Sequence, residues 1–176
     1  MLDKDYLELL EPLKQQKLMR NIKRIFIHCT ASYQETYKDE NLVREFKRKG
    51  WRYPGYHYVI RPDGTIFNML SEDKVSNGVA GYNSTAINIS YVGGITKNNH
   101  RGVDNRTPQQ KATLLKLLQD LRVKYPKAYI MGHRDISPDK NGNGKIDTWE
   151  YIKACPCFNA MEEYKDLNLG LNKPAN

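Results

Sequence analysis

Short apolar runs alternate with helix-like segments along this chain, and that alternation limits the possible folds more than any other feature. The runs are rich in Ile, Val, Phe and Tyr, residue types that favour β-strands. Four of them and the returning arm of one hairpin are predicted to be strands: residues 22–29, 56–61, 65–69, 86–92 and 128–131. Strands that alternate with helices, with one hairpin, predict an α/β fold with a central mixed β-sheet flanked by helices.

Two amphipathic helices are predicted between these strands. One covers residues 39–49 and stops at Gly50, and the other runs from the cap residue Thr107 to residue 124. A short helix is also expected over residues 6–13, and a final helix at Trp149 or later.

The length of 176 residues suits one domain with a sizeable core. Since no repeat or linker divides the chain, we expect a single domain over residues 21–165. A helical extension over residues 1–20 precedes it, and a loose tail over residues 166–176 follows it. We also expect a monomer.

The net charge of +8 favours anionic partners such as wall polymers, nucleic acid or membrane surfaces. The basic residues form no stripe interleaved with aromatic residues, so nucleic acid is not the expected partner. No stretch is apolar for long enough to cross a membrane. Asp3 and Asp5 stand where a signal peptide would be basic and then apolar. These features predict synthesis in the cytoplasm without a signal peptide.

Two histidines and one cysteine supply the residue types of a catalytic metal site. His28 and His133 each fall at the end of a predicted strand, which places them at the rim of the sheet. With Cys155 they make a set of two imidazoles and one thiolate, which suits a catalytic zinc ion with water in the fourth position. Cys157 is only two residues further on, and an exchange of the two cysteines stays open. Cys29 follows an apolar strand and is expected to pack as a small hydrophobic residue.

Seven short segments together resemble one known family, the zinc-dependent N-acetylmuramoyl-L-alanine amidases of the type 2 class. This class includes phage amidase lysozymes and shares its fold with peptidoglycan recognition proteins. The matching segments occur in the family's order between about residues 22 and 160: 25–31, 55–60, 81–83, 92–94, 107–110, 132–133 and 153–156. Any one of them alone would be a weak signal, whereas seven in order are specific.

The resemblance implies a zinc ion on His28, His133 and Cys155, with Tyr56 and Lys153 as catalytic helpers. Zinc can polarise the scissile carbonyl and lower the pKa of bound water. Lys153 would then stabilise the oxyanion of the tetrahedral intermediate, and Tyr56 would hold the water or pass a proton. Without the metal set, Lys153 would be interpreted as a solvated cation and Tyr56 as a packed strand residue.

Only one of the neighbours Tyr56 and His57 is expected to face the metal, because adjacent side chains of a strand point to opposite faces. The family pattern implies Tyr56, which leaves His57 as a structural histidine. His100 lies in a polar loop and is expected to be exposed.

The family pattern does not explain the insertion over residues 139–150, which matches the calcium-binding loop of EF-hands. Its candidate ligands are the side chains of Asp139, Asn141, Asn143, Asp147 and Glu150 and the carbonyl of Lys145. The preceding segment does not resemble an entering helix, and the loop has only three carboxylates, so modest calcium affinity is predicted. The competing interpretation is a polar Asn/Gly loop that binds no metal.

These observations favour a zinc hydrolase that cuts the amide bond between N-acetylmuramic acid and L-alanine in peptidoglycan. Its setting would be the cell wall, as a phage or prophage endolysin or a bacterial wall-remodelling enzyme. The alternative is a non-catalytic peptidoglycan-binding module of the same fold. Such modules usually lack the thiolate ligand, so the presence of Cys155 favours catalysis.

Overall fold

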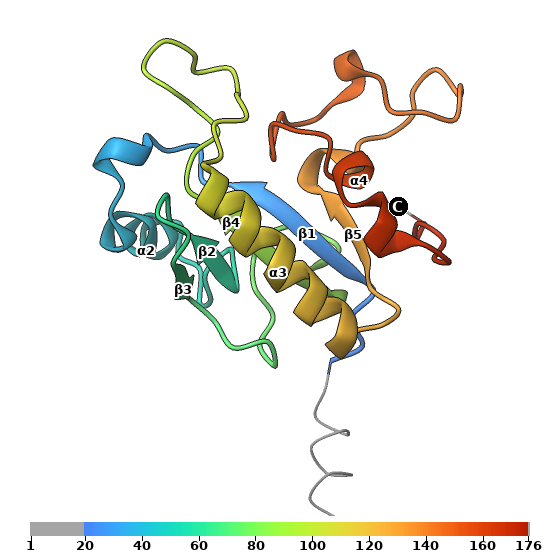
Figure 1. The fold of residues 1–176 in the computed structure, drawn as a ribbon, viewed down its shortest axis with the longest axis horizontal. Helices are drawn as coiled ribbons and strands as arrows, with labels where there is room; N and C mark the ends of the chain where they lie inside the picture. Colours follow the sequence, from blue (N-terminus) through green and yellow to red (C-terminus); the bar gives the residue numbers. More distant parts are fainter. Residues whose placement is uncertain (1–19, 176) are drawn as a thin grey trace, which may run out of the picture.

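Five strands form one mixed sheet in the order β3-β2-β4-β1-β5 (Figure 1). The computed structural model describes residues 20–175, so the helix expected over residues 6–13 lies outside the described residues. The strands are β1 (Arg24–Cys29), β2 (Tyr58–Ile60), β3 (Ile66–Asn68), β4 (Ala86–Tyr91) and β5 (Tyr129–Gly132). β3 pairs antiparallel with β2, and the other neighbouring strands pair in parallel. The predicted mixed sheet is confirmed.

β1 lies between β4 and β5, and all six of its residues are buried. His28 is in register with Ser90 of β4, and Ile27 is in register with Gly132 of β5. Parallel pairing brings the carboxyl ends of these strands to the same edge of the sheet. The residues that follow β1 and β5 therefore lie side by side.

The helices cover both faces of the sheet. α3 (Pro108–Lys124) crosses one face (Figure 1), where Leu114 and Leu118 pack with Ile60. α2 (Asp39–Arg48) packs against Val59, the neighbour of Ile60 on β2. Because adjacent residues of a strand point to opposite faces, α2 lies on the other side of the sheet.

The remaining helical elements are short. They are η1 (Gln34–Thr36), η2 (Asn83–Thr85), η3 (His133–Ile136), η4 (Thr148–Glu150), α4 (Ala160–Glu163) and η5 (Lys165–Asn168). Among the described residues, no helix is long and apolar enough to span a bilayer.

Three local predictions differ from the structure. The final helix expected at Trp149 or later is divided into the turn η4 and the short helix α4. Between them, Pro156 lacks an N–H and Cys157 has φ +73°, which an α-helix does not allow. The ladder of β2 begins at Tyr58 instead of residue 56, although His57 still donates a hydrogen bond to the Asn88 carbonyl (2.8 Å).

The segment expected to be a loose tail is attached to the sheet. Asn168 is buried, and its amide both accepts a hydrogen bond from the Ile130 N–H and donates one to the Ile130 carbonyl (2.9 Å each). Lys173 donates a hydrogen bond to the Asp135 carbonyl (2.8 Å). An apolar pattern does not indicate which backbone groups pair with distant side chains, so this attachment could not be predicted from the sequence.

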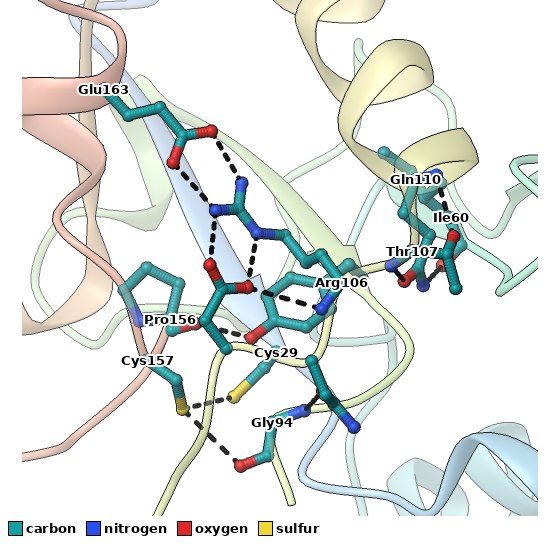
Figure 2. A network of polar contacts seen from close by, with 12 residues as sticks. Cys29, Ile60, Gly94, Arg106, Thr107, Gln110, Pro156, Cys157 and Glu163 are labelled. Atoms are coloured by element: carbon teal, nitrogen blue, oxygen red, sulfur yellow. Dashed lines mark hydrogen bonds and ion pairs between the residues drawn. The ribbon is translucent and has the colours of Figure 1, made fainter.

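A capping box starts α3. Thr107 Oγ1 accepts a hydrogen bond from the Gln110 N–H (3.1 Å), and Gln110 Oε1 accepts one from the Thr107 N–H (3.0 Å). The same Gln110 amide donates to the carbonyls of Ile60 and Val92 at the ends of β2 and β4 (Figure 2). The cap therefore ties the helix to the sheet.

Replacing Thr107 by Ala is expected to lower the free energy of unfolding by about 1 to 2 kcal/mol, because the N-cap acceptor is lost. Urea titration measures this change. Lys116→Ala, at an exposed position of the same helix, is the control and is expected to change stability by less than about 0.5 kcal/mol. Equal midpoints for Thr107→Ala and the unmodified protein would contradict the capping argument.

Candidate metal centre

The structure brings the side chains of His28, His133 and Cys155 together at the carboxyl ends of β1 and β5. His28 Nδ1 lies 3.1 Å from His133 Nδ1 and 3.7 Å from Cys155 Sγ. All three ligand atoms lie within 4.8 Å of one another, and within residues 20–175 no other group of His, Cys, Asp or Glu side chains is gathered in this way.

The spacing and the protonation of this group fit zinc. A tetrahedral zinc ion with ordinary bond lengths holds two nitrogens about 3.3 Å apart, and a nitrogen and a sulfur about 3.6 Å apart. Burial lowers the pKa of His28 to about 4 and that of His133 to about 3, so both imidazoles are neutral at neutral pH. Neutral imidazoles are the form that binds metal.

The turn after β5 positions His133. Asp135 Oδ2 accepts a hydrogen bond from the Gly132 N–H (2.7 Å), which closes the chain tightly around η3. A Cβ atom on Gly132 would stand 2.5 Å from Cδ of Pro156, so only glycine lets the segment that carries Cys155 approach this closely. The Arg134 N–H then donates to the Cys155 carbonyl (2.8 Å) and joins the two ligand-bearing segments.

A buried polar network holds the residues after Cys155 (Figure 2). The Tyr91 hydroxyl of β4 donates a hydrogen bond to the Pro156 carbonyl (2.7 Å). The Arg106 guanidinium lies 3.3 Å from the ring centroid of Phe158, and its side chain is fully buried. Burial alone would lower the pKa of Arg106, but the net shift is upward because it forms ion pairs with the carboxylates of Asp104 and Glu163. The Arg106 guanidinium therefore stays positively charged, and its contact with Phe158 anchors the segment that carries Cys155.

The two other cysteines face away from the histidines. Cys157 Sγ lies 3.6 Å from Cys29 Sγ and 3.7 Å from the Gly94 carbonyl (Figure 2). The pKa of Cys29 is raised to about 12, chiefly by a hydrogen bond with Cys155, so Cys29 remains a thiol. Of the two candidates left open by the sequence, the structure places Cys155 in the cluster.

Both residues implied as catalytic helpers lie near the cluster. The centroid of the Tyr56 ring is 5.1 Å from that of His28. Burial raises the pKa of Tyr56, so its hydroxyl keeps its proton at neutral pH. Lys153 is exposed, and after burial its positive charge is a further contribution to the lowered pKa values of His28 and His133.

His57 occupies a structural position, as its place beside Tyr56 predicted. It is completely buried, and its Nδ1 accepts a hydrogen bond from the Asn88 N–H (3.0 Å). Asn88 itself was missed by the sequence analysis, although its Oδ1 lies 2.8 Å from His28 Nε2. The only signal was an amide side chain inside a predicted strand that also contains Ser90 and is buried throughout. His100 is exposed, as expected, and its Nδ1 lies 3.0 Å from the Tyr33 hydroxyl.

The loop over residues 139–150 is held by its own polar groups. Asp139 accepts hydrogen bonds from the N–H groups of Gly142 and Gly144 (2.7 Å each), and both glycines have positive φ. Glu150 is buried and accepts from the Lys140 N–H (2.6 Å). The other side chains, Asn141 and Asn143, donate to Asp147 (2.9 Å each). These contacts leave calcium binding, including the part of the Lys145 carbonyl, as a prediction from the sequence.

A cavity of about 220 Å³ opens next to the end of β1. Ala31, Ser32 and Tyr33 line one wall, and Tyr37 and Leu42 line another.

Three comparisons with known proteins agree with this geometry. Residues 18–149 match the family described as N-acetylmuramoyl-L-alanine amidase. The endolysin of Enterobacteria phage K11 is 38% identical over 144 residues, which cover 81% of this chain and 85% of the relative. The endolysin of Escherichia phage T7 is 32% identical over 145 residues, with coverage of 82% and 86%.

Solved structures have the same fold. The N-acetylmuramoyl-L-alanine amidase LysC from Clostridium intestinale URNW is 26% identical and superposes with a TM-score of 0.65, covering 86% of this chain and 87% of that one. Apis mellifera PGRP-SA superposes with a TM-score of 0.62 over 85% of this chain and 84% of that one. At 18% identity this second likeness concerns the fold alone.

Proposed function

The chain belongs to the N-acetylmuramoyl-L-alanine amidase family, and we propose that it is a zinc-dependent endolysin of the phage type. Its reaction is hydrolysis of the amide bond between N-acetylmuramic acid and L-alanine of the stem peptide in peptidoglycan. The observation that carries the zinc proposal is the cluster of His28, His133 and Cys155 ligand atoms within 4.8 Å.

The protein holds the metal through two neutral imidazoles and one thiolate. When bound, zinc supplies a Lewis acid for the scissile carbonyl and an activated water molecule. His28 and His133 contribute their Nδ1 atoms, because these are the nitrogens that face each other (3.1 Å). Cys155 contributes Sγ from the segment that the Arg106 network anchors.

Lys153 and Tyr56 act on the reacting atoms. The Lys153 ammonium, whose charge contributes to the lowered pKa of both histidines, would stabilise the negative oxygen that develops on the scissile carbonyl. Tyr56 keeps its hydroxyl proton because burial raises its pKa, so it can donate a hydrogen bond or pass that proton.

The substrate sets the place of action, because peptidoglycan is a component of the cell wall. The net charge of +8 favours association with anionic wall polymers. A role as a binding module without catalysis is disfavoured, since all three metal ligands and both helpers are present. The monomeric state expected from the sequence stays a prediction.

One zinc ion per chain and amidase products are expected from the purified protein. Digested sacculi should release intact stem peptides with a free L-alanine amine, which mass spectrometry identifies. His28→Ala and Cys155→Ser should lose both zinc and activity, because each removes a ligand. Cys157→Ser is the matched control and should retain both. Products with a cut glycan or a cut peptide would refute the proposed reaction.

Replacing Lys153 by Met is expected to lower kcat by roughly 100- to 1,000-fold, the usual effect of removing one oxyanion donor. Zinc content and thermal stability should not change, because Lys153 is exposed. Lys127→Met removes an equally exposed lysine at the far end of β5 and should keep full activity. A Lys153→Met enzyme with unaltered kcat would remove this residue from the mechanism.

Calcium is expected to raise the melting temperature of the zinc-loaded protein, since an ion bound only by the folded state stabilises it. Calorimetry in millimolar calcium measures the shift, with equal magnesium as the control. Asp139→Ala should abolish the calcium response, because it removes the first carboxylate of the loop. If the unmodified protein melts at the same temperature with and without calcium, the loop over residues 139–150 is a polar loop only.

A further inference from the structure

A chain of buried hydrogen bonds runs from the metal cluster into the sheet. His28 Nε2 contacts Asn88 Oδ1 (2.8 Å), and Asn88 Nδ2 contacts Ser76 Oγ (2.8 Å). Ser76 Oγ in turn contacts His57 Nδ1 (3.2 Å). The exposed fraction of each of these four residues is 1% or less. The side of His28 that faces away from the cluster is therefore in contact with protein and shielded from water.

The donors and acceptors in this chain can be assigned by starting from a backbone N–H, which can only donate. The backbone N–H of Asn88 donates to His57 Nδ1 (3.0 Å), so that nitrogen is an acceptor. The neutral ring then carries its proton on Nε2, which lies 3.1 Å from the Lys74 carbonyl. Arg20 Nη1 is also 3.2 Å from this Nε2, but its protons have the carbonyls of Glu72 and Lys74 as acceptors.

The remaining directions are then determined. Because His57 Nδ1 is an acceptor, the Ser76 hydroxyl donates to it and accepts from the Asn88 amide nitrogen. This orients the amide oxygen of Asn88 toward His28. An oxygen of this kind only accepts, so His28 must carry its proton on Nε2.

Close packing holds the Asn88 side chain in place, and the hydrogen bond to Ser76 decides which end of its amide faces His28. Gly78 lies directly against it, and a Cβ atom on Gly78 would stand 2.4 Å from both Cγ and Oδ1 of Asn88. The backbone of Asn88 is fixed as well, because it pairs with Phe26 in the parallel ladder of β1 and β4. The acceptor that His28 faces is therefore held in one place.

We propose that Asn88 is a positioning residue, which fixes the tautomer and ring orientation of His28 and so sets the affinity for zinc. With its proton on Nε2, His28 presents a bare Nδ1 lone pair to His133 and Cys155. The other tautomer would place a proton among the ligands. Hydrogen-bonded partners of ligating histidines generally act in this way. The inference rests on the proposed zinc site.

The first test needs neither zinc nor substrate. A long-range 1H–15N spectrum of the metal-free protein reports which nitrogen of each imidazole carries the proton. His28 is expected as the Nε2–H tautomer, and Asn88→Leu is expected to shift it toward a mixture of tautomers. A wild-type His28 with its proton on Nδ1 would overturn the proposal whatever the zinc affinity is.

The second test measures zinc dissociation constants by competition with a chromogenic chelator. Asn88→Leu keeps a similar volume without an acceptor and should weaken zinc binding by roughly 10- to 100-fold. Asn88→Asp keeps the acceptor and should bind at least as tightly as wild type. Asn168→Leu is the matched control: it removes another buried asparagine with two hydrogen bonds, which should lower stability and leave zinc affinity unaltered.

Each outcome decides the matter. A folded Asn88→Leu protein with wild-type zinc affinity would overturn the proposal, as would equal losses in Asn88→Leu and Asn168→Leu. If Asn88→Leu does not fold, Ser76→Ala takes its place, because it frees the Asn88 amide to turn, and unaltered affinity there is equally decisive. If wild type itself binds no zinc, the proposed cofactor is wrong, while the tautomer measurement still tests the role of Asn88.

Discussion

The parallel pairing of β1 with both of its neighbours is the constraint on which the rest of the structure depends. It brings His28 and His133, which are 105 residues apart in sequence, to the same edge of the sheet. A slip of one residue in β1 would turn His28 toward the face that α3 covers. Such a slip would be costly because β1 and β4 are fully buried. It would move Ile25 and Ile27 out of their packing against α3 and onto the opposite face of the sheet. The fold and the metal cluster therefore share one determinant.

The third ligand reaches the cluster by a different route. Cys155 does not lie on a strand, and the chain after it is irregular up to α4. Its place depends on polar contacts that are buried: the Tyr91 hydroxyl on the Pro156 carbonyl and the paired charge of Arg106. A buried charge is tolerated only when its partners are in place, and the paired Arg106 guanidinium packs on the Phe158 ring, three residues after Cys155. The sheet supplies the histidines, and the polar network supplies the thiolate.

Much of this arrangement could be predicted from the sequence, because apolar periodicity reports strands and helices directly. The strands that carry His28 and precede His133 followed from that pattern, as did α3 with its cap at Thr107. Polar partners could not be predicted in the same way. Asn88 is one amide in a mostly apolar strand, and Arg106 stands just before the helix cap Thr107, outside any periodic segment. Their roles depend on the distant groups that they contact, and apolar periodicity carries no information about those contacts.

X-ray absorption at the zinc edge can determine whether His28, His133 and Cys155 together hold one zinc ion. We expect one sulfur ligand at about 2.3 Å and two imidazole nitrogens at about 2.0 to 2.1 Å, with a fourth light atom. In Cys155→Ser the sulfur shell should vanish. Two sulfur ligands, or a sulfur shell that survives this substitution, would rule out this ligand set.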